Sequence, residues 1–117
     1  MRILALAATT LFVLIASTAA RAHAFLEHAE PRVGSTVATA PREVVLSFTQ
    51  NLEPAFSSVE VSDANGARVD QGKARIGANT MRVGLKRLAP GTYHVRWHVL
   101  SVDTHTTEGS FAFHIGK

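Results

Sequence analysis

The stretch that decides the fold is TYHVRWHV, residues 92–99, in which apolar and polar residues alternate strictly. Successive side chains of a β-strand point to opposite sides, so the apolar members share one face. These members are Tyr93, Val95, Trp97 and Val99. His94 and His98 fall on the opposite face. The stretch therefore predicts a half-buried strand whose histidines face solvent.

The same period of two recurs along the rest of the chain and predicts further strands. These strands cover residues 43–50, 57–63, 80–85 and 110–115. Turn signals separate them: Asn65-Gly66 predicts a hairpin turn, and LAPG before Tyr93 indicates a tyrosine corner. We expect an all-β fold, an immunoglobulin-like Greek-key β-sandwich or barrel of about seven strands.

The first 22 residues have the pattern of a secretory signal peptide. Arg2 supplies the positive start, residues 3–15 form an apolar run, and residues 20–22, Ala-Arg-Ala, match the motif before a cleavage site. Cleavage after residue 19 or 20 and an uncleaved anchor are the alternatives, but the run is short for a membrane span of about 20 apolar residues. We expect cleavage after Ala22, leaving a single domain, residues 23–117, in the periplasm with no membrane span.

Composition excludes several function classes for that domain. Without Arg2 and Arg21, ten basic residues face nine acidic ones, so the net charge is near +1 and gives no nucleic-acid signature. Lys73, Arg75 and Arg82 have no interleaved aromatic residues and are interpreted as a solvated face. The chain has no cysteine, which rules out thiolate as a metal ligand. Motifs typical of hydrolases are also missing from the sequence, so we expect binding rather than catalysis.

One segment indicates a metal site. In SVDTHTTEG, residues 101–109, Asp103 and His105 are two apart, so their side chains point the same way in an extended chain and reach one ion. The segment joins two strong strands, where binding groups usually lie. Asp-x-His is a weak motif by itself, and a hydrogen-bonded turn explains it equally well.

His23 strengthens the metal interpretation. As the first residue after cleavage, it offers both its α-amine and its ring Nδ1 to one ion. Together with the His105 ring and the Asp103 carboxylate, this makes three nitrogens and one oxygen. That set suits tetragonal Cu(II), whereas Ca(II) and Mg(II) prefer oxygen and Zn(II) ranks below Cu(II). We expect one Cu(II) ion per chain. The remaining histidines are interpreted as surface residues: His28, His94, His98 and His114.

The chain resembles the CopC family of periplasmic copper-resistance proteins. The resemblance is carried by HAFLEHAEPRVGS from residue 23, VVLSFTQNLEPAFSSVEV from residue 44 and PGTYHVRWHVLSVDTHTTEGSFAFHI from residue 90. It implies an immunoglobulin-like sandwich or barrel, a Cu(II) site at His23, Asp103 and His105, and an inner-membrane copper-transport partner of the CopD kind.

Two departures from the family pattern matter. Met81 is the only methionine after the signal, so a thioether site for Cu(I) cannot be built. Thr106 stands where proline often follows the motif histidine, which loosens the backbone but removes no ligand.

Three functions from different classes remain open. The first is a soluble Cu(II) carrier or buffer in copper resistance or import. The second is a histidine-brace copper oxidase, which about 95 residues and an acidic ligand disfavour. The third is an immunoglobulin-like interaction module without a metal, in which Asp103 and His105 are structural. We expect the first.

Overall fold

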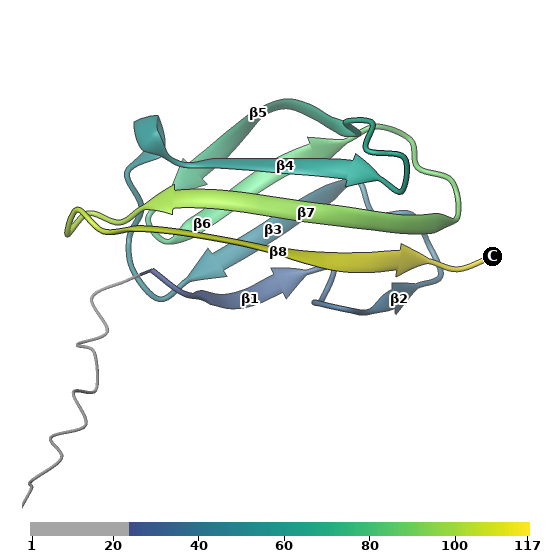
Figure 1. Cartoon of the computed structure of the whole chain (residues 1–117), viewed down its shortest axis with the longest axis horizontal. Coiled ribbons are helices and arrows are strands. Elements are labelled where there is room, and N and C mark those ends of the chain that lie inside the picture. The colour runs from purple at the N-terminus through teal and green to yellow at the C-terminus, as the bar shows by residue number, and fades with distance from the viewer. Residues whose placement is uncertain (1–23) are drawn as a thin grey trace, which may run out of the picture.

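Two four-stranded sheets pack face to face in the computed structural model, which describes residues 24–117 (Figure 1). The first sheet has the order β1-β3-β6-β5. Its strands are β1 (Leu26–Glu30), β3 (Glu43–Phe48), β6 (Thr80–Leu85) and β5 (Asp70–Gly77). The second sheet has the order β2-β8-β7-β4. Its strands are β2 (Thr36–Val37), β8 (Thr106–Ile115), β7 (Gly91–Leu100) and β4 (Ser58–Asp63). The all-β sandwich expected from the sequence is confirmed.

The core lies between the sheets and is built from the inward faces of the alternating strands. In β7 the predicted alternation holds: Tyr93, Val95, Trp97 and Val99 are buried, and the residues between them are exposed. Phe48 of β3 meets Trp97 of β7 edge to face, with ring centroids 5.2 Å apart, which joins the two sheets. The predicted tyrosine corner is present, because the Tyr93 hydroxyl donates to the Ala89 carbonyl at 2.6 Å.

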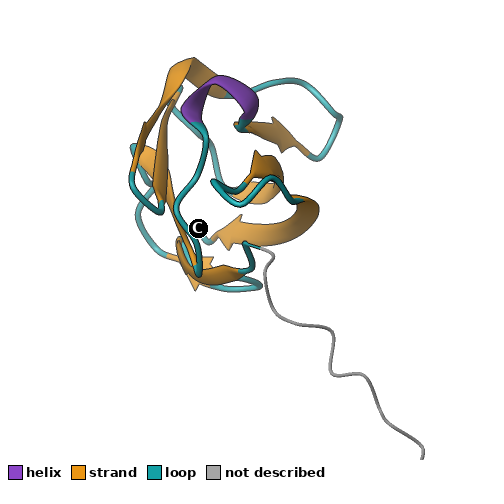
Figure 2. Cartoon of the chain, turned by 90° about the vertical axis from the view of Figure 1, so that its left-hand side faces the viewer, coloured by secondary structure: helices purple, strands orange, loops and turns teal. Residues whose placement is uncertain are grey.

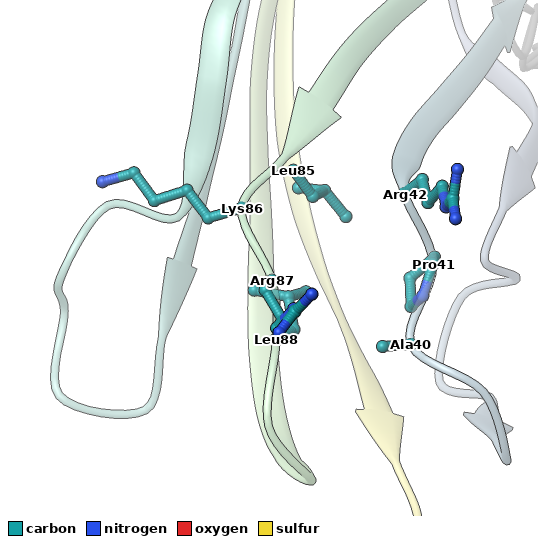
Figure 3. A pocket seen from close by; sticks show the side chains of 7 residues that line it. All are labelled: Ala40, Pro41, Arg42, Leu85, Lys86, Arg87 and Leu88. Atoms are coloured by element: carbon teal, nitrogen blue, oxygen red, sulfur yellow. The ribbon is translucent and has the colours of Figure 1, made fainter.

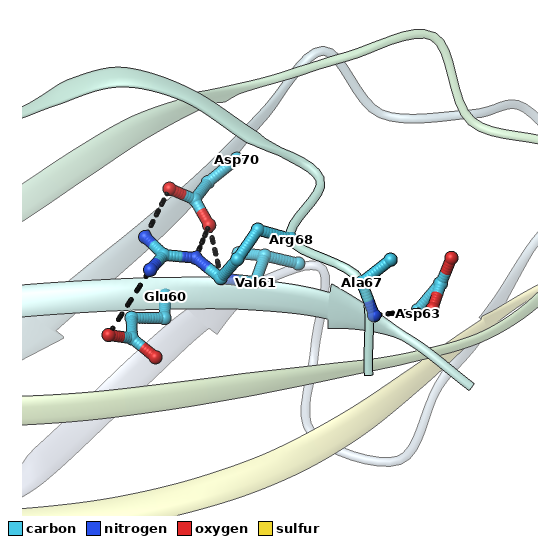
Figure 4. A network of polar contacts seen from close by, with 6 residues as sticks. All are labelled: Glu60, Val61, Asp63, Ala67, Arg68 and Asp70. Atoms are coloured by element: carbon cyan, nitrogen blue, oxygen red, sulfur yellow. Dashed lines mark hydrogen bonds and ion pairs between the residues drawn. The ribbon is translucent and has the colours of Figure 1, made fainter. Parts of the chain in front are cut away.

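Asp70 holds the corner at which the chain passes from one sheet to the other, between β4 and β5 (Figure 4). Its Oδ1 accepts from the backbone N–H of Val61 at 2.9 Å and from Arg68 Nε at 2.6 Å. Its Oδ2 accepts from Arg68 Nη2 at 2.7 Å. Arg68 also pairs with the exposed Glu60 at 3.3 Å. The Asp70 side chain is only 8% exposed, so this corner depends on a buried carboxylate whose two oxygens are both hydrogen-bonded.

Some local predictions are wrong. The Asn65-Gly66 turn forms, with Gly66 N–H donating to the Asp63 carbonyl at 3.0 Å. The hairpin it closes is short, because after Val69, whose N–H donates to the Val61 carbonyl at 2.8 Å, the chain leaves β4 and pairs with β6. Strands β1, β2 and β5 lie outside the five runs in which the sequence alternates, and the described residues form eight strands, close to the expected number of about seven. β8 also begins at Thr106, earlier than predicted, since its first residues pair with the end of β7.

The cations interpreted as a solvated face lie on β5 and β6. Arg75 and Arg82 are directly opposite each other, where like charges repel. Glu43 of β3 accepts from both, at 3.3 and 3.2 Å. The two arginines are exposed and balanced by Glu43, which agrees with a solvated face.

Candidate metal centre

Asp103 and His105 lie in the loop between β7 and β8, at the end of the sandwich that faces the viewer in Figure 2. His105 Nδ1 is 3.5 Å from Asp103 Oδ1. Two ligand atoms at this separation can both lie about 2.0–2.2 Å from one ion, as nitrogen and oxygen ligands of zinc do. The side chains are 47% and 35% exposed, so an ion from solvent reaches them. The structure thus brings these two predicted residues together.

Hydrogen bonds from Ser101 close the loop. Ser101 N–H donates to the His105 carbonyl at 2.9 Å, and its hydroxyl contacts the same carbonyl at 3.1 Å. The hydroxyl also donates to Asp103 Oδ1. Thr104, between the two candidate ligands, has a φ of +73°, a left-handed conformation that is uncommon for a β-branched residue. The loop is therefore a tight, bonded turn.

The Asp103 carboxyl is favoured in its ionised form. The hydrogen bond from Ser101 is the main cause that lowers its pKa below the usual value, and the neighbouring His105 lowers it further. A carboxylate is the form that coordinates a cation, and an imidazole coordinates when it is neutral. Asp103 is therefore held in the form that coordinates a cation.

The start of the described chain is fastened next to this loop. Thr107 Oγ1 donates to the Ala24 carbonyl at 2.6 Å, and Ala24 is fully buried. Thr107 follows His105 by two residues, about 6.6 Å along a strand. His23, the third predicted ligand residue, lies outside the described residues. Ala24, to which it is bonded, is held at the same end as Asp103 and His105.

Within residues 24–117, no three His, Asp or Glu side chains gather closely enough to hold a metal ion. Asp103 and His105 are therefore two ligands of a site that needs more from elsewhere. The surface interpretation agrees with His94 and His98, which are exposed on β7. His28 is exposed too and pairs with Glu30 at 3.0 Å. His114 is half-buried and bonded to Thr92 Oγ1 at 2.9 Å, so its interpretation as an exposed residue is wrong.

A groove at the other end of the sandwich has a different character (Figure 3). It has a volume of about 360 Å³ and lies at the start of β3. The start of the described chain is at the other end of this strand, because the N–H of Phe25 donates to Oγ1 of Thr49, which directly follows β3. Its lining is Ala40, Pro41, Arg42, Leu85, Lys86, Arg87 and Leu88. This lining offers cations and apolar side chains but no carboxylate or imidazole, so it does not suit a metal ion.

Sequence reasoning missed Ser101 and Thr107. One signal was available for Ser101: the alternation of β7 continues through Val99 to position 101, which places a hydroxyl on the apolar face. No such signal exists for Thr107, because its partner Ala24 is 83 residues away in the chain.

Comparison with known proteins gives consistent matches. A family model described as the CopC domain matches residues 26–116. Copper resistance protein C of Xanthomonas campestris pv. juglandis is 31% identical over 110 residues, which cover 86% of this chain and 86% of that protein. Copper transport protein CutJ of Bacillus subtilis is 32% identical over 111 residues, which cover 92% of this chain but 20% of CutJ. The crystal structure of CopC from Methylosinus trichosporium OB3b matches with a TM-score of 0.71 and 35% identity, over 80% of this chain and 93% of that one.

Proposed function

This chain belongs to the CopC family, and we propose that it is a periplasmic Cu(II)-binding protein that carries or buffers copper in copper resistance or import. The observation that carries the proposal is the pair of Asp103 and His105, with ligand atoms 3.5 Å apart on an accessible loop. The names of the relatives, a copper resistance protein and a copper transport protein, support copper as the cargo.

In this proposal His23 completes the ligand set. Removal of residues 1–22 as a signal peptide makes His23 the first residue, so that its amine and ring Nδ1 both bind the ion. The bond between Thr107 and Ala24 supports this arrangement, because it holds the neighbouring residue beside the loop. One Cu(II) ion per chain then has three nitrogen ligands and one oxygen ligand, a set that suits tetragonal copper.

The oxidation state follows from the available ligands. Soft Cu(I) prefers thiolate and thioether, but the chain has no cysteine, and Met81 is fully buried in β6. A carboxylate ligand favours the oxidised ion, which opposes the cycling between Cu(II) and Cu(I) that an oxidase needs. We therefore propose binding rather than catalysis.

The proposed partner is an inner-membrane copper-transport protein of the CopD kind. CutJ supports this partner, because a region similar to this chain makes up one fifth of a longer copper transport protein. Two exposed apolar side chains next to residues of this site offer contact area for such a partner: Val102, which precedes Asp103, and Phe25, which follows Ala24. Among residues 24–117, the structure has no helix of the length and apolar character that a membrane span requires.

The test is a Cu(II) titration of the chain produced with His23 first, in competition with a chelator of known affinity. We expect one ion per chain, and quenching of Trp97 fluorescence as it binds. His105→Ala and Asp103→Ala should weaken binding by at least the roughly 10- to 100-fold that loss of an outer partner of a metal ligand costs. His98→Ala is the matched control, because His98 lies exposed on β7 and should leave the affinity unchanged.

Each alternative has its own outcome. An effect of His98→Ala as large as that of His105→Ala would show that the ligands are misassigned. Absence of Cu(II) uptake would favour the interaction module without a metal. Copper-dependent consumption of a reductant together with oxygen would favour the histidine-brace oxidase.

A further inference from the structure

We propose that Ser101 is a positioning residue of the copper site, whose hydroxyl fixes the Asp103 carboxylate in the orientation that receives the ion. This inference rests on the proposed function. It concerns a residue that binds no metal itself and acts only through Asp103.

Burial singles out Ser101. Its exposed fraction is 0%, and apart from the aromatic Tyr93 and Trp97 it is the only polar residue among residues 24–117 that is buried as a whole, since Asp70 buries its side chain alone. A buried hydroxyl costs free energy unless it is hydrogen-bonded, so a serine at this position needs a hydrogen-bond partner that offsets the loss of its hydration. Its partners are the Asp103 carboxylate and the His105 carbonyl, one from each candidate ligand residue.

The backbone that carries the hydroxyl is bonded to a neighbouring segment. Ser101 forms a bridge with Leu52, which is buried in the core. The next residue, Val102, donates its N–H to the Asn51 carbonyl at 3.0 Å. Ser101 is thus tied to the segment after β3 as well as to β7. A donor on a backbone bonded in this way restricts the carboxylate before an ion arrives.

The backbone N–H and the hydroxyl of Ser101 have separate roles, and a substitution can remove the hydroxyl alone. Its backbone N–H donates to the His105 carbonyl at 2.9 Å, and alanine at this position keeps that donor. Only the hydroxyl reaches Asp103. Ser101→Ala should therefore keep the turn closed while it removes this hydrogen bond and leaves the carboxylate with His105 as its remaining partner. Outer partners that orient a metal ligand typically contribute 10- to 100-fold in metal affinity.

The first measurement uses the wild-type protein without copper. If Ser101 keeps the loop in one conformation without copper, backbone amide relaxation should give order parameters of about 0.85 for residues 102–105, the value of a rigid backbone. Values below about 0.6 would show a flexible loop and would overturn the proposal. This measurement needs no variant, so it decides even if Ser101→Ala fails to fold.

The second measurement compares Cu(II) affinity and the Cu(II) EPR spectrum of Ser101→Ala with those of Ser110→Ala. The control removes a hydroxyl from an exposed position of β8. We expect Ser101→Ala to weaken binding by about 10- to 100-fold and to alter the spectrum, and Ser110→Ala to change neither. In an Asp103→Ala background the effect of Ser101→Ala should fall below about twofold, because contacts that act through one another are not additive.

The outcomes separate this inference from the proposed function. If the wild type binds Cu(II) through His105 but Ser101→Ala binds equally well with an unchanged spectrum, the positioning role is wrong and the proposed function stands. Equal effects of Ser101→Ala with and without Asp103 would also overturn it, since they indicate a general structural role. If the wild type takes up no Cu(II), both proposals fail together.

Discussion

Gly109 shows how a single residue decides the packing beside the candidate metal centre. It lies on β8 directly opposite Trp97 of β7. A Cβ atom at this position would lie 2.5 Å from Trp97 Cζ2 and 2.8 Å from Cε2, closer than atoms approach in folded proteins. Only glycine therefore lets the indole lie across the neighbouring strand.

We predict that Gly109→Ala destabilises the protein by about 1–3 kcal/mol, the usual cost of overpacking a core. The free energy of unfolding is measured by urea denaturation, and Trp97 fluorescence reports the change directly. Gly77→Ala is the matched control, since a Cβ there meets open space, and we expect it to stay within about 0.5 kcal/mol of the wild type. Equal stabilities of the two variants would show that the indole moves aside without cost.

The sequence predicted the positions of some residues but not the importance of others. The period of two placed Trp97 inside and His98 outside, and it placed Asp103 and His105 on one side. The importance of Gly109 and Thr107 depends on which residues face each other across strands. Periodicity within one strand does not contain that register, so these residues were not predicted.

At the level of strands and turns, the corner between β4 and β5 depends on an ionised Asp70. The hydrogen bond from Arg68 is the main cause that lowers the pKa of Asp70 below its usual value. A carboxyl whose pKa is lower in the folded state contributes stability that is fully present above its unfolded pKa of about 3.9. That contribution is lost as the pH falls through the folded pKa.

We predict that Asp70→Asn lowers the free energy of unfolding at pH 7 by about 1.5–3 kcal/mol, the contribution of a hydrogen bond to a charged group. The variant should also lose less stability on acidification than the wild type does. Urea denaturation at pH 7 and pH 3 measures both effects. Glu60→Gln is the control, because this exposed pair with Arg68 should contribute less than about 1 kcal/mol. An unchanged acid dependence in Asp70→Asn would mean that Asp70 does not stabilise the corner.

Strands were predicted where one face is buried and missed where it is not. β7 alternates fully buried and exposed residues and was predicted along most of its length. β5 lies at the edge of its sheet, and no residue of it is fully buried. Its inward side chains, Ala74 and Ile76, are only half-buried, so the sequence carries little alternation there. The turn at Gly66 was predicted from local chemistry, but the change of sheet that follows depends on tertiary packing.

At the level of the whole molecule, the sandwich brings together segments that are distant in sequence. The bond between Ala24 and Thr107 spans 83 residues, and it holds the start of the described chain beside the loop of Asp103 and His105. Neither composition nor periodicity shows that two residues so far apart in the sequence lie close together in space. Joining His23 to Asp103 and His105 in one site therefore relied on ligand chemistry and on the family resemblance.

We predict that one residue placed before His23 damages the site although every side chain is still present. An added glycine keeps the imidazole but moves the free amine one residue away, which breaks the chelate that we propose for the amine and ring of His23. Folding should be unchanged, because residues 24–117 keep all their contacts, including the bond from Thr107 to Ala24. The Cu(II) affinity should fall by roughly tenfold or more, and the Cu(II) EPR spectrum should change.

The experiment compares the chain that begins with His23 and the same chain that begins Gly-His, by competition against one copper chelator. His105→Ala in both chains provides the matched control. If the amine and the His105 ring bind the same ion, the extra glycine should matter much less once His105 is removed, because ligands of one ion are coupled. Equal affinities and identical spectra of the two parent chains would mean that the amine is not a ligand. Copper would then be held by side chains alone, and the position of His23 directly after the proposed signal peptide would have no role in binding.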